Sequence, residues 1–173
     1  KLNANIGFFV SDQKVKILKP PFLSDKLIIQ SFIIDANRRK FTRLVKILND
    51  VNELLATQTE DAFVVDRSNN NLVSLSRDFP VSKIIDPNMK CHVLREKIQL
   101  PLAAKEEIHQ YTVLGRDIDN YGHMNNARYL DLISEQVSQI EQITVNYIKP
   151  VKEGMVLDIA RESAAHKVFY KFM

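Results

Sequence analysis

A dense group of polar residues lies in the second half of the chain, directly before an expected helix. The segment from Gly115 to Val137 reads GRDIDNYGHMNNARYLDLISEQV, in a chain with only four glycines and four histidines. Its polar and glycine positions are Asp117, Asp119, Gly122, His123, Asn125 and Asn126. Polar groups at this density cost stability when they are buried without partners. The segment is therefore either an elaborate helix start or a reaction site.

The same residues can build the start of a helix. Asn126 is a candidate N-cap, because an asparagine side chain can accept from the free backbone N–H groups of the first turn. Asn125 could take that role if the helix begins one residue earlier. Gly122, just upstream, would let backbone N–H groups approach a ligand closely.

The cluster also contains what acyl transfer to water requires. A helix N-terminus presents free N–H donors and a positive dipole end, which suit a carbonyl oxygen that gains negative charge. Asp119 is a candidate general base for water, and His123 could orient or protonate the reacting groups. On the residues alone, a capped helix with a polar entry loop explains the segment equally well.

The elements around this segment are expected to be mostly strands. Runs of β-branched and aromatic residues bounded by turn formers predict long antiparallel strands with short connections. The run at 40–50 also fits a helical period, but its hairpin-like flanks favour a strand. A helix with an apolar stripe of Leu130, Ile133 and Val137 is expected at 127–137. The expected strands span 6–18, 26–36, 40–50, 54–66, 107–114, 141–149, 155–163 and 166–172, with a short one near 72–75.

A short repeat predicts two duplicated modules; the alternative is that two unrelated hairpins both use proline as a strand stop. Val15, Lys19-Pro20 and Leu27 correspond to Val145, Lys149-Pro150 and Leu157, each at an offset of 130 residues. In both copies a strand ends at Lys-Pro, and a second strand follows a short turn. The proline-rich stretch between the copies is longer than most connections inside one compact unit. We expect an N-terminal module at 1–78, a linker at 79–105 and a C-terminal module at 106–173. The chain opens at Lys1, and we expect the first module's initial strand and helix to be missing.

Composition and charge narrow the function classes. A formal net charge of +3 is too small to indicate nucleic-acid binding, although it suits an acidic protein or an anionic cofactor tail. The run Arg38-Arg39-Lys40 could contact such a group. The single cysteine, Cys91, fits a reducing cytosol, and its neighbours include no activating base. No apolar run approaches the roughly 20 residues needed to span a bilayer. The histidines show no metal-ligand spacing, so neither a metal nor a cofactor is expected.

The segment DIDNYGHMNNARYL resembles the active site of hot-dog-fold thioesterases. The resemblance is nearest to the fatty acyl-acyl-carrier-protein thioesterases of plants and bacteria. It implies an α+β chain with a tandem (double) hot-dog fold, in which antiparallel sheets each wrap around a helix. In that family the C-terminal module carries the catalytic segment.

Matched to the family pattern, Asp119 corresponds to the catalytic aspartate and His123 to the catalytic histidine. Asn125 and Asn126 correspond to the asparagine pair at the helix start, with Gly122 beside them. The sequence departs from the pattern at Tyr121, where the family has asparagine. The family's acidic residue and cysteine on the next strand fall on Pro150 and Val151, and nearby Glu153 has no assigned role.

The resemblance implies a cytoplasmic enzyme of fatty acid biosynthesis that hydrolyses acyl thioesters of acyl carrier protein. Two alternatives stay open: an acyl-CoA thioesterase of the same fold, and an acyl-binding hot-dog module without catalysis. Two modules can pair within one chain, so a homodimer is possible but not required.

Overall fold

The structure, a computed structural model, describes residues 5–69, 71–74, 85–86, 88–89, 98, 107–134, 137, 139–164 and 167–173. The chain forms two compact units. The first consists of Lys1–Lys97 and Ile140–Ile148, and the second consists of Ile98–Gln139 and Lys149–Met173. Cys91 and most of the predicted linker lie outside the described residues. The predicted module boundaries therefore stay a prediction.

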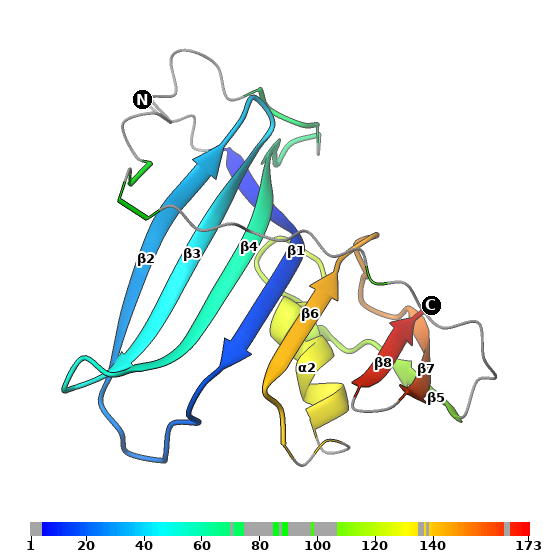
Figure 1. Cartoon of the computed structure of the whole chain (residues 1–173). Helices are drawn as coiled ribbons and strands as arrows, with labels where there is room; N and C mark the ends of the chain where they lie inside the picture. The colour runs from blue at the N-terminus through cyan, green and yellow to red at the C-terminus, as the bar shows by residue number, and fades with distance from the viewer. Residues whose placement is uncertain are drawn as a thin grey trace. The chain divides into compact units, whose positions relative to one another are not determined.

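The first unit is built on a five-stranded antiparallel sheet (Figure 1). The strand order is β2-β3-β4-β1-β6, so the strand nearest the N-terminus is inserted between β4 and β6. Leu44, Leu48, Leu55, Val64 and Val65 are among its buried apolar residues. The strands are β1 (Ile6–Ile17), β2 (Leu27–Ala36), β3 (Lys40–Asn49), β4 (Leu54–Asp66) and β6 (Gln142–Asn146).

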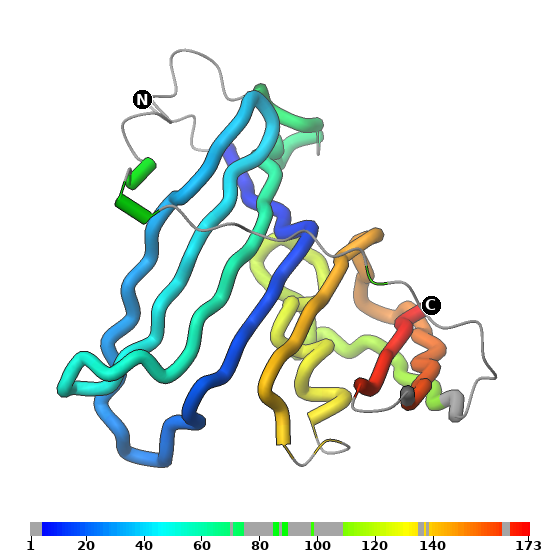
Figure 2. The backbone as a smooth tube through the Cα atoms, in the orientation of Figure 1, coloured from blue at the N-terminus to red at the C-terminus, as the bar shows by residue number. Residues whose placement is uncertain are grey.

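The ladder between β1 and β6 is centred on two residues that are 130 positions apart, which is the offset of the sequence repeat. The two strands run side by side and antiparallel, with Lys14 opposite Thr144 at the centre of the ladder (Figure 2). Ile17 donates its N–H to the Glu141 carbonyl at 2.8 Å, and Tyr147 donates to the Ser11 carbonyl at the same distance. Adding 130 to the donor's residue number and subtracting 130 from the acceptor's converts the first of these bonds into the second. The ladder is therefore locally two-fold symmetric about the Lys14–Thr144 pair, as duplicated strands would be.

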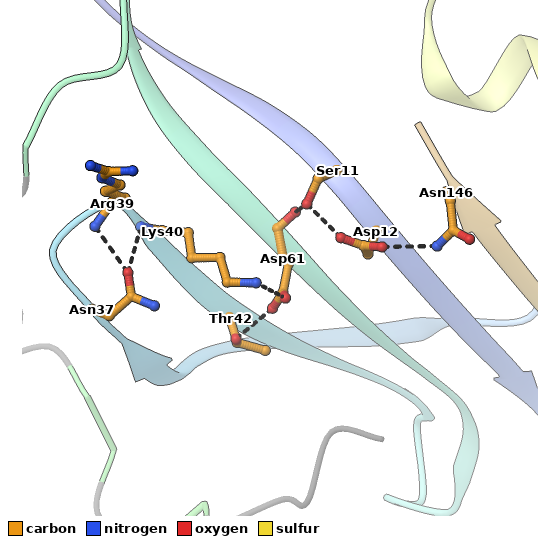
Figure 3. A network of polar contacts seen from close by, with 8 residues as sticks. All are labelled: Ser11, Asp12, Asn37, Arg39, Lys40, Thr42, Asp61 and Asn146. Carbon is orange, nitrogen blue, oxygen red and sulfur yellow. Dashed lines mark hydrogen bonds and ion pairs between the residues drawn. The ribbon is translucent and has the colours of Figure 1, made fainter. Parts of the chain in front are cut away.

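A row of polar side chains crosses this sheet from β3 to β6 (Figure 3). Asp61 is 2% exposed, and it accepts from the Thr42 hydroxyl and from Lys40 Nζ, both at 2.6 Å. On the neighbouring strand, Asp12 accepts from Ser11 Oγ at 2.6 Å and from Asn146 Nδ2 at 2.8 Å. Buried polar groups need such partners, and these contacts therefore fix the register of four strands.

The second unit combines a three-stranded antiparallel sheet with one helix, α2 (Asn126–Ser134). The strands are β5 (Glu107–Thr112), β7 (Val156–Ala164) and β8 (Lys167–Phe172), in the order β5-β7-β8. The buried core consists of Val113, Met124, Leu157 and Ile159. Tyr129 and Leu132 of α2 pack against this core, and the Tyr129 ring meets Phe172 edge-on at 5.2 Å. These contacts anchor α2 in the second unit.

The predicted elements agree with the structure except in detail. The run at 40–50 is a strand, and the strand near 72–75 is reduced to a single bridge between Leu72 and Val65. The described part of the helix spans Asn126–Ser134, and Val137 lies outside it. The α2 residues on the core of the second unit, Tyr129 and Leu132, precede the predicted stripe by one position. The described residues include no helix that is long and apolar enough to cross a membrane.

Candidate active site

The segment before α2 folds into a small closed loop. Ile118 and Met124 form an antiparallel bridge, and Asp119 donates its N–H to the His123 carbonyl at 2.8 Å. Gly122 closes the turn by donating to the Asp119 carbonyl at 3.0 Å, with a positive φ of 76° that favours glycine. The loop therefore brings the two predicted catalytic residues, Asp119 and His123, opposite each other.

The carboxylate of Asp119 is partly used by this loop. Its Oδ1 accepts from the backbone N–H of Tyr121 at 2.8 Å, as in an Asx turn, and from that of His123 at 3.4 Å. Its Oδ2 accepts no hydrogen bond from the part of the chain that the structure describes. One oxygen of the carboxylate thus orients the group, while the other stays available for a water molecule.

The helix cap is Asn125 rather than Asn126, which corrects our first choice. Asn125 Oδ1 accepts from the N–H of Ala127 at 3.0 Å, and the Asn125 carbonyl accepts from Arg128 N–H at 2.9 Å. Asn126 is instead the first helical residue. The sequence could not separate the two because neighbouring asparagines satisfy the same capping preference.

Most backbone donors around the helix start are already paired. The N–H groups of Gly122, Met124 and Asn125 donate to the carbonyls of Asp119, Val151 and Asp117, at 3.0, 2.7 and 2.8 Å. The N–H of Asn126 donates to no acceptor among the described residues. Among the donors expected between Gly122 and Asn126, it is the one best placed to receive an oxyanion.

A carboxylate to which we had assigned no role lies just before this loop. Asp117 is 0% exposed, and its side chain accepts from the Tyr111 hydroxyl at 2.6 Å, the Leu114 N–H at 2.9 Å and Arg128 Nε at 3.0 Å. Burial raises the pKa of Asp117, but these three donors outweigh it and hold the pKa below its ordinary value of 3.8. Tyr111 and Arg128 belong to β5 and α2, so no local spacing in the sequence could indicate this cluster.

The remaining predicted positions have simple surroundings. Tyr121 is 39% exposed and contributes its backbone N–H to the Asp119 carboxylate. Val151, which takes the place of the family cysteine, packs on the core and accepts from Met124 N–H. The Glu153 carboxylate lies over Gly115, where an added Cβ would be 2.9 Å from Oε1. Within the described residues, no three His, Cys, Asp or Glu side chains form a group that could hold a metal.

One cavity in the first unit does not involve these residues. It has a volume of about 410 Å³ and lies between the β1–β2 loop and the β3–β4 turn. Its lining includes Lys19, Phe22, Lys26 and Asp50, and no residue of the 115–137 segment.

The C-terminal part of the chain, residues 101–173, matches the family model of the acyl-ACP thioesterase C-terminal domain. No curated protein sequence matches the chain.

Solved structures resemble nearly the whole chain. An acyl-ACP thioesterase from Bacteroides thetaiotaomicron superposes with a TM-score of 0.79 at 14% identity, covering 97% of this chain and 72% of that one. A 12:0-ACP thioesterase from Umbellularia californica gives a TM-score of 0.80 at 14% identity, covering 97% and 71%. At such identities the likeness establishes the fold alone, and it confirms the expected hot-dog architecture.

The fold extends beyond thioesterases. A MaoC-like dehydratase from Phytophthora capsici superposes with a TM-score of 0.62 at 13% identity, covering 95% of this chain and 65% of that one. The architecture therefore does not select the reaction, which has to be argued from the site.

Proposed function

From the match of residues 101–173 to the acyl-ACP thioesterase C-terminal domain, we propose that the chain releases free fatty acid from acyl carrier protein thioesters. The family match supports the coarser activity, thioester hydrolysis. The observation that carries the proposal is the placement of Asp119 opposite His123, in a loop that ends at Asn126, whose N–H has no acceptor among the described residues.

In the proposed reaction, Asp119 acts as the general base. Its Oδ2 takes a proton from a water molecule, whose oxygen attacks the thioester carbonyl carbon. The carbon–sulfur bond then breaks, and His123 supplies a proton to the departing thiolate. The proton held by Asp119 then passes to His123, so both side chains return to their starting state. The products are a carboxylic acid and a free thiol, so water is the only co-reactant.

The negative oxygen formed in the attack needs a donor that is already in place. The Asn126 N–H meets that need because it lies at the positive end of α2 and has no acceptor among the described residues. A fixed backbone donor requires no reorganisation when charge develops, and losing one such donor typically costs roughly 100-fold to 1,000-fold in turnover.

Acyl carrier protein is proposed as the carrier from the family, with fatty acid biosynthesis in the cytoplasm as the setting. The proposal rests on residues 101–173, because the family match covers these positions. The departure at Tyr121 favours one alternative, a hot-dog module that binds acyl groups without hydrolysing them. A phenol lacks the paired donor and acceptor of the family's asparagine.

A hydrolysis panel tests the activity. Thioesters of several acyl lengths on acyl carrier protein and on coenzyme A are incubated with the chain, and free thiol is measured. We expect turnover with acyl carrier protein thioesters, reduced at least about 100-fold by Asp119→Asn. The matched control, Asp50→Asn, alters an exposed aspartate of the first unit and should retain wild-type turnover. Saturable binding without thiol release would support the non-catalytic module.

A second pair of variants isolates the backbone donor. Asn126→Pro removes the N–H at the first helical position, where proline is well tolerated. Asn126→Ala loses the same side chain but keeps the N–H. We expect the proline variant to turn over roughly 100-fold more slowly than the alanine variant. Equal rates in two folded variants would remove Asn126 from the oxyanion site.

A further inference from the structure

An ion pair between buried Asp117 and half-buried Arg128 joins the two ends of the candidate catalytic loop. Asp117 ends the 3-10 turn Gly115–Asp117, and Arg128 lies in the first turn of α2. Their side chains meet at 3.0 Å through Arg128 Nε and Asp117 Oδ1. The segment between them, residues 118–127, contains Asp119 and His123.

Asp117 holds the far end of this loop by its backbone as well. Its carbonyl accepts from Asn125 N–H at 2.8 Å, while its own N–H donates to the Leu114 carbonyl at 2.9 Å. Asn125 is the cap of α2, so a shift of Asp117 would also move the residue that begins the helix. Side chain and backbone of one residue thus fix both the entry to the loop and its exit.

Because the Asp117 carboxylate is buried, it depends on the groups that donate hydrogen bonds to it. A carboxylate that is 0% exposed is tolerated because donors compensate for its lost hydration. Tyr111 Oη and Leu114 N–H supply two donors from the β5 side, and Arg128 supplies the donor from the helix. Arg128 also binds Asp131 through its Nη1, so the guanidinium is held from both sides and cannot rotate freely.

We propose that Asp117 and Arg128 are positioning residues, which set the distance between the Asp119 carboxylate and the Asn126 N–H. Neither side chain touches the reacting atoms in this scheme. The inference rests on the proposed function, because it assigns the pair to that reaction. Misplacement of a catalytic group by about 1 Å can cost roughly 100-fold in rate.

The test compares Arg128→Met, which keeps the aliphatic stem, with Arg128→Lys, which restores a single cationic donor. Arg67→Met is the matched control, since Arg67 is exposed and lies in the first unit. Turnover and KM are measured with the thioester that the wild-type chain hydrolyses fastest. We expect Arg128→Met to lower kcat by about 10-fold to 100-fold with KM within about twofold. Arg128→Lys should recover kcat to within about threefold of wild type, and Arg67→Met should match wild type.

A readout without substrate separates this inference from the proposed function. Amide hydrogen exchange at Asn125, whose N–H donates to Asp117, should accelerate at least about tenfold in folded Arg128→Met and not in Arg67→Met. Unchanged exchange would overturn the inference, and so would a wild-type kcat in Arg128→Met. If the wild-type chain hydrolyses no thioester, the proposed function fails, while the exchange experiment still decides whether the pair holds the loop.

Discussion

Lys40→Met should strongly destabilise the first unit, because Lys40 neutralises a buried carboxylate. Lys40 Nζ lies 2.6 Å from Asp61 Oδ2, and their side chains are 18% and 2% exposed. Methionine keeps the apolar stem of lysine but removes the ammonium group. Removing one partner of a buried ion pair costs about 3–5 kcal/mol. Since Lys40 retains some solvent contact, we expect about 3 kcal/mol.

The same substitution at an exposed pair provides the control. Lys19 and Glu53 are 3.1 Å apart with side chains 56% and 49% exposed, and exposed pairs contribute at most about 1 kcal/mol. Both lysines lie in the first unit, so urea unfolding followed by circular dichroism compares them on the same transition. Adding Asp61→Asn to Lys40→Met should recover about 1–2 kcal/mol, because the uncompensated charge disappears while Thr42 keeps an acceptor. The reasoning is refuted if Lys40→Met and Lys19→Met cost the same.

Three further predictions concern the loop and the helix start. Asn125→Ala should cost about 1 kcal/mol of unfolding free energy and Asn126→Ala less than about 0.5, since only Asn125 caps the helix; equal costs in thermal or urea unfolding would contradict the cap assignment. Gly122→Ala should cost about 1 kcal/mol from its φ of 76° alone, because an added Cβ meets nothing within 4 Å; a stabilised variant would show that the turn has a different conformation. The pKa of Asp117 in the folded chain is below 3.8, so near that pH the unfolded chain binds more protons at this residue. The contribution of the Asp117 carboxylate to stability is therefore lost as the pH falls through the lower, folded pKa. Urea titrations should therefore show the gap between wild type and Asp117→Asn narrowing below about pH 3.8, and a constant gap would refute the assignment.

Local structure was predictable because local chemistry determines it. β-branched runs ended by turn formers predicted each strand from β1 to β8 to within a few residues. Strand order was less accessible. The meander expected from sequence order holds for β2, β3 and β4, but β1 lies between β4 and β6. Such pairings join segments far apart in the chain, where no spacing rule applies.

In the candidate site too, contacts between near neighbours in the sequence were predictable, and contacts between distant segments were not. The loop residues were found because they cluster in the sequence, and their hydrogen bonds are between near neighbours. The choice between Asn125 and Asn126 as cap depended on one residue of helix register, which sequence patterns do not fix. The partners of Asp117 come from β5 and α2, so its role became visible only after these elements were placed.

The two aspartates of the motif show why residue type alone does not assign a catalytic role. Asp117 and Asp119 are two positions apart, and both are carboxylates before the same helix. Asp117 is 0% exposed, and its two oxygens accept from Tyr111, Leu114 and Arg128, so the carboxylate is shielded from solvent water. Asp119 uses only Oδ1 for the loop. We therefore expect Asp117→Asn to act mainly on stability and loop position, whereas Asp119→Asn should lower turnover in a chain as stable as wild type. If Asp119→Asn instead unfolded the loop while Asp117→Asn left it intact, the roles of the two carboxylates would have to be exchanged.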